Sequence, residues 1–162
     1  MERIAVIDYG AGNLRSVEKA LRFVAGDRHD VEVTQDPDVV ARADRVVFPG
    51  QGAIRDCMAQ IRSCELEACI LDAVERKPFL GICIGLQALM PRSDEDAETV
   101  GLGVYPGHCA RFPSDARDET TGLRLKVPHM GWNEVTFRQP HTLWEGIQDK
   151  SRFYFVHSYF VV

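Results

Sequence analysis

The stretch KPFLGICIGLQALM, at residues 77–90, is the clearest indication of the fold class. It begins with a short apolar run, continues as Gly-x-Cys-x-Gly, and then shows the pattern of a helix start. A cysteine between two glycines at a strand-to-helix turn is the thiol version of a nucleophile elbow. The stretch therefore predicts an open α/β sheet with Cys83 at the carboxyl end of one strand, where such sheets bind their ligands.

The residues before this stretch alternate between strand-like and helix-like patterns, which is typical of βαβ units and a parallel sheet with helices on both faces. Apolar residues at helical spacing precede Gly26, a residue type that often ends a helix. Strands are predicted at residues 3–10, 30–35, 44–50 and 78–83, and helices at residues 13–26, 39–43, 53–76 and 84–90.

The pattern changes after Met90, where residues 91–107 are polar and predict a loop. Further strands are predicted at residues 108–113, 123–129, 133–137 and 152–162, with a short helix at residues 141–147. No repeat or linker divides the chain, so we expect one domain over residues 1–162. The last residues form an apolar strand with no closing turn, which favours a domain that is incomplete at its C-terminus.

Composition excludes several classes of protein. The chain has 162 residues and a net charge of −5, so it lacks the basic surface of a nucleic-acid-binding protein. It contains no apolar run long enough for a membrane span and no signal peptide, which predicts a cytoplasmic location. The five cysteines include no C-x-x-C pair, which argues against a disulfide framework or a zinc site. Cys57, Cys64 and Cys69 are expected to be small buried or half-buried side chains.

Cys83 has two possible roles when only its pentapeptide is considered. A helix that starts directly after it would favour the thiolate and offer N–H groups to an oxyanion. A buried structural cysteine with coincidental glycines is equally consistent. A second turn, FPGQGA at residues 48–53, ends an earlier strand and is a candidate oxyanion loop, although Pro-Gly often marks a plain turn. Two glycine-rich turns at strand ends favour a catalytic site.

Five motifs give the chain a family resemblance. GICIGLQ and FPGQGA resemble the class I glutamine amidotransferases. DYGAGNLRSV (residues 8–17), KVPHMGWNEV (126–135) and FYFVHSY (153–159) resemble more narrowly the glutaminase subunits of imidazole glycerol phosphate synthase. The motifs stand in the family's order, from residue 3 to the last residue. The resemblance implies a three-layer α/β sandwich with a mostly parallel central sheet, its C-terminal part missing.

The resemblance also implies a reaction. Cys83 would attack the side-chain amide of glutamine, release ammonia and form a glutamyl thioester that water hydrolyses. Oxyanion donors would come from Gly52 and the backbone around Ile84. The glutamine site would be formed by Gln87, Glu95, His157 and Ser158. Glu95 lies in the acidic run SDEDAE, which departs from the family's pattern and also fits a solvated loop. No cofactor or metal is implied.

A partner is implied as well. In the family the ammonia passes to a cyclase subunit with a (β/α)8 barrel, and the heterodimer makes imidazole glycerol phosphate for histidine biosynthesis. The motifs YGAGN and PHMGWN resemble segments near that interface. The contacts implied there are Asn13, Met130, Trp132 and Tyr154.

One part of the family's machinery is absent from these 162 residues. The histidine and glutamate of the triad belong to a His-Pro-Glu motif, which the sequence does not contain. A fragment of an ordinary subunit, a sequence cut short, and a degenerate homologue that only binds the cyclase would each explain this. None of the histidines matches the catalytic position, although His157 or His129 would be possible substitute bases. An unrelated cysteine hydrolase or a DJ-1-like protein would share the elbow, but PHMGWN and YGAGNLRS argue against both.

Overall fold

The computed structural model describes residues 1–10, 13–96, 98–118 and 120–162. The chain divides into two compact units. The first unit contains Met1–Ala110 together with Val161–Val162, and the second contains Arg111–Phe160. Ala11 and Gly12, from the motif at residues 8–17, lie outside the described residues.

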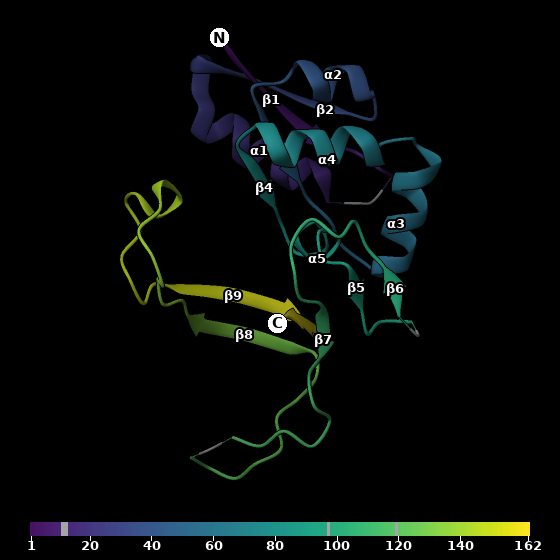
Figure 1. Cartoon of the computed structure of the whole chain (residues 1–162). Coiled ribbons are helices and arrows are strands. Elements are labelled where there is room, and N and C mark those ends of the chain that lie inside the picture. Colours follow the sequence, from purple (N-terminus) through teal and green to yellow (C-terminus); the bar gives the residue numbers. More distant parts are fainter. Residues whose placement is uncertain (11–12, 97, 119) are drawn as a thin grey trace. The chain divides into compact units, whose positions relative to one another are not determined.

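A parallel sheet forms the centre of the first unit, and the sequence prediction of such a sheet is confirmed (Figure 1). Its strands stand in the order β2-β1-β3-β4. Adjacent strands pair in parallel register, for example Val6 with Val33 of β2 and with Val47 of β3. The strands are β1 (Glu2–Ile7), β2 (His29–Thr34), β3 (Arg45–Phe48) and β4 (Phe79–Gly81).

The predicted helices of this unit are also confirmed. Residues 53–76 form two helices, because the chain turns through the left-handed region at Glu65. Gly26 adopts a positive φ directly after the first helix, as its position predicts. The helices are α1 (Leu14–Ala25), η1 (Gly26–Arg28), α2 (Pro37–Arg42), α3 (Ile54–Ser63), α4 (Glu67–Arg76) and α5 (Ile84–Gln87).

The alternation of side chains along β1 shows how the layers pack. Ala5 and Ile7 belong to one buried cluster, which also includes buried side chains of α2, α3 and α4. Ile4 and Val6 point to the other face, where they join a second cluster with residues of α1. Helices therefore cover both faces of the sheet, which is the three-layer α/β arrangement expected.

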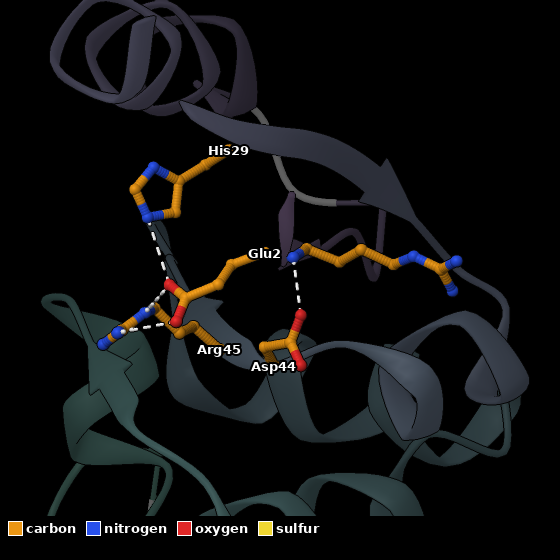
Figure 2. Close-up of polar contacts among 5 residues, drawn as sticks. Glu2, His29, Asp44 and Arg45 are labelled. Atoms are coloured by element: carbon orange, nitrogen blue, oxygen red, sulfur yellow. Dashed lines mark hydrogen bonds and ion pairs between the residues drawn. The ribbon is translucent and has the colours of Figure 1, made fainter. Parts of the chain in front are cut away.

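Polar contacts hold the amino ends of the three strands β1, β2 and β3 together (Figure 2). Arg45 Nε donates to Glu2 Oε2 over 3.0 Å, and His29 Nε2 lies 3.1 Å from the same oxygen. The Arg3 N–H donates to Asp44 over 2.7 Å. Hydrogen bonding and charge from Arg45 lower the pKa of the Glu2 carboxyl. These groups lie at the amino ends of the parallel strands, whereas Cys83 follows the carboxyl end of β4.

Short strands replace part of the loop predicted at residues 91–107, so that prediction was wrong in detail. These strands are β5 (Arg92–Ser93) and β6 (Thr99–Val100), whereas the strand predicted at residues 108–113 is confirmed as β7 (Cys109–Arg111). Ser93 is completely buried and pairs with Thr99 on one side and with Cys109 on the other. Two-residue strands show no periodicity in a sequence, because pairing with distant residues is what makes them strands.

The second unit is built on an antiparallel pair, β8 (His129–Glu134) and β9 (Arg152–His157), with the short 3₁₀ helix η2 (Thr142–Trp144) in the segment between them. The strand predicted at residues 133–137 instead begins at His129. The strand predicted at residues 123–129 does not form. Pro128 has no N–H for a ladder, and Leu125 donates to Ala116 within the preceding loop.

The predicted final strand, at residues 152–162, is interrupted at Ser158. It continues as β10 (Tyr159–Val161). None of the helices in the described part of the chain combines the length and apolar character needed to span a bilayer.

Candidate active site

Cys83 lies between β4 and α5 in a strained backbone conformation. Its φ of 55° and ψ of −114° are unusual for a residue with a side chain, and such strain clusters at functional sites. Backbone hydrogen bonds hold the turn on both sides. Ile82 donates to the Phe48 carbonyl over 3.0 Å, and the N–H groups of Leu86 and Gln87 donate to the Cys83 carbonyl over 3.0 Å. The thiol is exposed, as an attacking nucleophile must be.

The glycines on either side of Cys83 allow the close approach that this elbow needs. A Cβ atom added at Gly85 would lie 1.8 Å from the Phe48 carbonyl oxygen, and one added at Gly81 would lie 3.0 Å from the backbone of Leu86. Real Cβ contacts are not as short as the first of these, so a side chain at residue 85 is excluded. The pentapeptide is therefore built into the backbone packing and is not a coincidence of composition.

The second glycine turn, at residues 49–52, adjoins the elbow. A Cβ atom added at Gly50 would lie 2.8 Å from Ile84 Cβ and 2.9 Å from the Gly85 nitrogen. Gly52 has a φ of 87°, in the region that favours glycine. Among the described residues, no hydrogen bond uses the N–H of Gly52 or of Ile84. These are the two N–H groups that the family resemblance implies as oxyanion donors.

Tyr9 packs against the glycine turn, a role that the sequence did not indicate. Its side chain is 1% exposed and lies edge-on to Phe48, with ring centroids 5.8 Å apart. The hydroxyl would lie 2.5 Å from a Cβ at Gly50, and it makes no hydrogen bond of good geometry among the described residues. Burial raises the pKa of Tyr9 far above its usual value, so the phenol stays neutral.

Gln87 and Glu95 both lie in the same unit as Cys83. Gln87 is one turn further along α5, and its buried Oε1 has no partner among the described residues. A buried unpaired acceptor is costly, so it is a natural place for a donor from a ligand. Glu95 is half-buried and not a fully solvated loop residue. Its Oε2 accepts a hydrogen bond from the Ile54 N–H over 2.9 Å, at the start of α3.

His157 and Ser158 belong to the second unit, where His157 forms a pair with His129. His129 Nδ1 lies 3.1 Å from His157 Nε2, and His157 Nδ1 lies 2.9 Å from the Tyr159 carbonyl oxygen. A carbonyl can only accept, so His157 donates through Nδ1 and its Nε2 accepts from His129. Both ring nitrogens of His157 are thus occupied, which argues against His157 as the substitute base.

A proton acceptor for Cys83 is not found among the described contacts. No described side chain is hydrogen-bonded to its sulfur. His29 lies at the amino ends of the strands, about 17 Å along β1 from the carboxyl ends at 3.3 Å per residue, so it is far from the thiol. Within the described residues, no group of three or more His, Cys, Asp or Glu side chains is arranged to hold a metal ion.

The residues expected at a partner interface are exposed where the structure describes them. Met130, Trp132 and Tyr154 are 61%, 60% and 54% exposed on β8 and β9. Trp132 and Tyr154 face each other across the ladder, with ring centroids 5.5 Å apart. Asn13, in the first unit, is also exposed and adopts a left-handed conformation before α1. Exposed aromatic side chains of this kind are common at interfaces.

The thiols should differ sharply in reactivity. Burial raises the pKa of Cys57 and of Cys109 to about 11, so both stay protonated near pH 8, and both are almost inaccessible. Iodoacetamide at pH 8 is therefore expected to modify Cys83 well before these two. Their labelling should rise only as the pH approaches 11. Peptide mass mapping after timed labelling measures this order, and faster labelling of Cys57 than of Cys83 at pH 8 would contradict it.

The class of protein follows from comparison with known families. Residues 5–162 match the sequence pattern of the family "Glutamine amidotransferase class-I", and the chain belongs to this family. Two solved structures share the fold. A putative GMP synthase component from Thermoplasma acidophilum has a TM-score of 0.62 at 15% identity, over 100% of this chain and 67% of that chain. A protein described as a glutamine amidotransferase has a TM-score of 0.62 at 17% identity, over 94% and 70% of the two chains.

Individual relatives are considerably more similar. The chain is 59% identical over 160 residues to the imidazole glycerol phosphate synthase subunit HisH of Dechloromonas aromatica, covering 99% of this chain and 73% of the relative. It is 57% identical over 158 residues to the HisH subunit of Thiobacillus denitrificans, covering 98% of this chain and 68% of the relative. The chain therefore spans about three quarters of the first relative's length and about two thirds of the second's.

Proposed function

We propose that the protein is the glutaminase subunit of an imidazole glycerol phosphate synthase and supplies ammonia for histidine biosynthesis. The observation that carries the proposal is the strained, exposed Cys83 beside the glycine turn at residues 49–52. Membership of the class I glutamine amidotransferases and the high identity to HisH subunits both support it. The family match begins at residue 5 and ends at residue 162, which supports one amidotransferase domain over residues 1–162.

The reaction begins with attack of the Cys83 sulfur on the side-chain carbonyl carbon of glutamine. A C–S bond forms, and the negative charge that develops on the carbonyl oxygen is stabilised by the N–H groups of Gly52 and Ile84. The C–N bond then breaks, and the nitrogen leaves as ammonia after taking one proton, which balances the proton that the Cys83 thiol loses on attack. Water adds to the glutamyl thioester, the C–S bond breaks, and glutamate and the free thiol result.

The substrate site is proposed to include Gln87, Glu95, His157 and Ser158. The unpaired Gln87 Oε1 can accept from a donor of the glutamine molecule, and the negative Glu95 carboxylate suits its α-ammonium group. Backbone groups at His157 and Ser158 are proposed to complete the site.

The ammonia acceptor is proposed to be a cyclase subunit with a (β/α)8 barrel, in a cytoplasmic heterodimer. The relatives are named as subunits of a synthase, which supports a partner of this kind. The exposed side chains of Met130, Trp132 and Tyr154, together with Asn13, are proposed to contact it. Their apolar area would be buried on association.

A second candidate function is a module that binds the cyclase without hydrolysing glutamine. One observation favours it: no described side chain is hydrogen-bonded to the Cys83 sulfur. A missing general base typically costs a factor of about 10² to 10⁴ in rate. The exposed hairpin that would bind the cyclase does not depend on that base.

Glutamate formation with and without the cyclase separates the two functions. The leading proposal expects the complex to form and to convert glutamine to glutamate and ammonia. A complex that forms on size-exclusion chromatography without producing glutamate would instead support the binding module. Absence of both complex and glutamate would contradict both proposals. Added ammonium salt provides the control, because it tests whether the cyclase itself is competent.

A further inference from the structure

The acidic loop at residues 93–96 is tied to the start of α3, directly after the glycine turn that carries the oxyanion donor Gly52. Glu95 Oε2 accepts from the Ile54 N–H over 2.9 Å, across 41 residues of sequence. Arg55 Nε and Asp96 Oδ2 lie 3.7 Å apart and add a second, exposed link between the same two segments. The loop therefore contacts the helix that begins where the glycine turn ends.

The start of α3 has no local cap, which explains why a distant carboxylate is used. Its N-cap residue is Ala53, whose side chain cannot accept a hydrogen bond. The first N–H groups of a helix need acceptors, and the positive end of the helix favours a negative charge there. Glu95 supplies both from another part of the chain.

Glu95 is itself held firmly, so it can act as a fixed point. Its N–H donates to Ser93 Oγ over 3.2 Å, and its carbonyl accepts from Thr99 Oγ1 over 3.0 Å. Ser93 is completely buried between β6 and β7. The position of the Glu95 carboxylate is thus set by the small sheet and not by a mobile surface loop.

The other end of the glycine turn is fixed as well. Phe48, the last residue of β3, is fully buried, and its carbonyl accepts from Ile82 over 3.0 Å. Only residues 49–53 separate Phe48 from Ile54. With both ends held, only a short connection can adjust the path of the turn and the orientation of the Gly52 N–H.

We propose that Glu95 is a positioning residue for the oxyanion turn. By holding the Ile54 N–H, it restrains the end of the turn and with it the orientation of the Gly52 N–H, the oxyanion donor of the proposed function. This role is distinct from contact with substrate, because it operates in the free protein. Only its consequence for catalysis rests on the proposed function.

The test is hydrogen exchange of the Ile54 amide and of residues 50–53 in the free 162-residue chain, measured by NMR. Glu95→Ala is expected to speed exchange of Ile54 about tenfold or more, since a charge-assisted hydrogen bond is lost. Glu95→Gln keeps an acceptor of the same shape without the charge and should show a smaller increase. Glu98→Gln is the matched control, because Glu98 is an exposed residue three positions after Glu95 and the substitution removes the same charge.

The exchange rates in these variants either support or contradict the positioning role of Glu95. Faster exchange confined to residues 50–54 in the Glu95 variants, and absent in Glu98→Gln, supports the proposal. Unchanged exchange in folded Glu95→Gln and Glu95→Ala would overturn it, and so would an equal increase throughout the first unit. If Glu95→Ala does not fold, Glu95→Gln decides alone. Because no glutamine is present, failure here is distinguishable from failure of the glutaminase proposal.

Steady-state kinetics of the complex with the cyclase give a second readout. A residue that only binds substrate affects mainly the KM for glutamine. A residue that positions the oxyanion turn affects kcat, because the oxyanion exists only in the transition state and intermediate. Glu95→Gln is therefore expected to lower kcat. A rise in KM with unchanged kcat would show a substrate contact only and would overturn the positioning role.

Discussion

Cys83→Ala should reduce ammonia release from glutamine, in the complex with the cyclase, to the background rate. Removing the nucleophile of an acyl-transfer site costs on the order of 10⁴-fold or more, because covalent catalysis has no other route. The substitution keeps a Cβ atom, so it does not change the strain at a residue with a φ of 55°. Glutamate production is the measurement, and synthesis driven by added ammonium salt should be unchanged.

A covalent probe tests the role of the Cys83 sulfur without measuring the rate of glutamine hydrolysis. A chloroketone analogue of glutamine should add once to the protein, with the Cys83 sulfur displacing chloride, and Cys83→Ala should abolish the added mass. Cys64→Ala is the matched control, because it removes another thiol, half-buried at the end of α3. A Cys83→Ala variant that still releases ammonia, or still takes up the probe at one site, would show that the nucleophile has been misassigned.

Gly85→Ala should be the most damaging single substitution for stability. The added methyl carbon would lie 1.8 Å from the Phe48 carbonyl oxygen, which is backbone and already accepts a hydrogen bond from Ile82. Neither group can rotate away, so the elbow must separate from β3. We expect a loss of about 4 kcal/mol or more in the free energy of unfolding, a large part of the stability of a typical domain.

Thermal unfolding measures this effect, and a fall in Tm of about 10 °C or more is expected if the variant folds at all. Gly131→Ala is the control, because a Cβ at that position meets nothing within 4 Å and no positive φ is involved. Its unfolding free energy should change by less than about 1 kcal/mol. Equal stability of Gly85→Ala and the unchanged protein would mean that the elbow does not pack as described.

Much of the candidate site could be predicted because it depends on local signals. A glycine on each side of Cys83, directly after an apolar run, indicates a sharp turn within a window of about ten residues. The same holds for the turn at residues 49–52. By contrast, the bond between Glu95 and Ile54 joins residues 41 apart and has no periodic pattern to reveal it. The acidic run around Glu95 looked like an ordinary solvated loop for that reason.

The amino-acid pattern alone was enough to predict the parallel sheet, the helices on both of its faces and the place of Cys83 at a strand end. These follow from side-chain periodicity and turn chemistry, which act between near neighbours. Three features became known only from the folded chain: Tyr9 lies against Gly50, His129 pairs with His157, and β8 starts at His129. Such contacts form between distant residues, and their energies depend on packing and hydrogen bonding that exist only after the chain has folded.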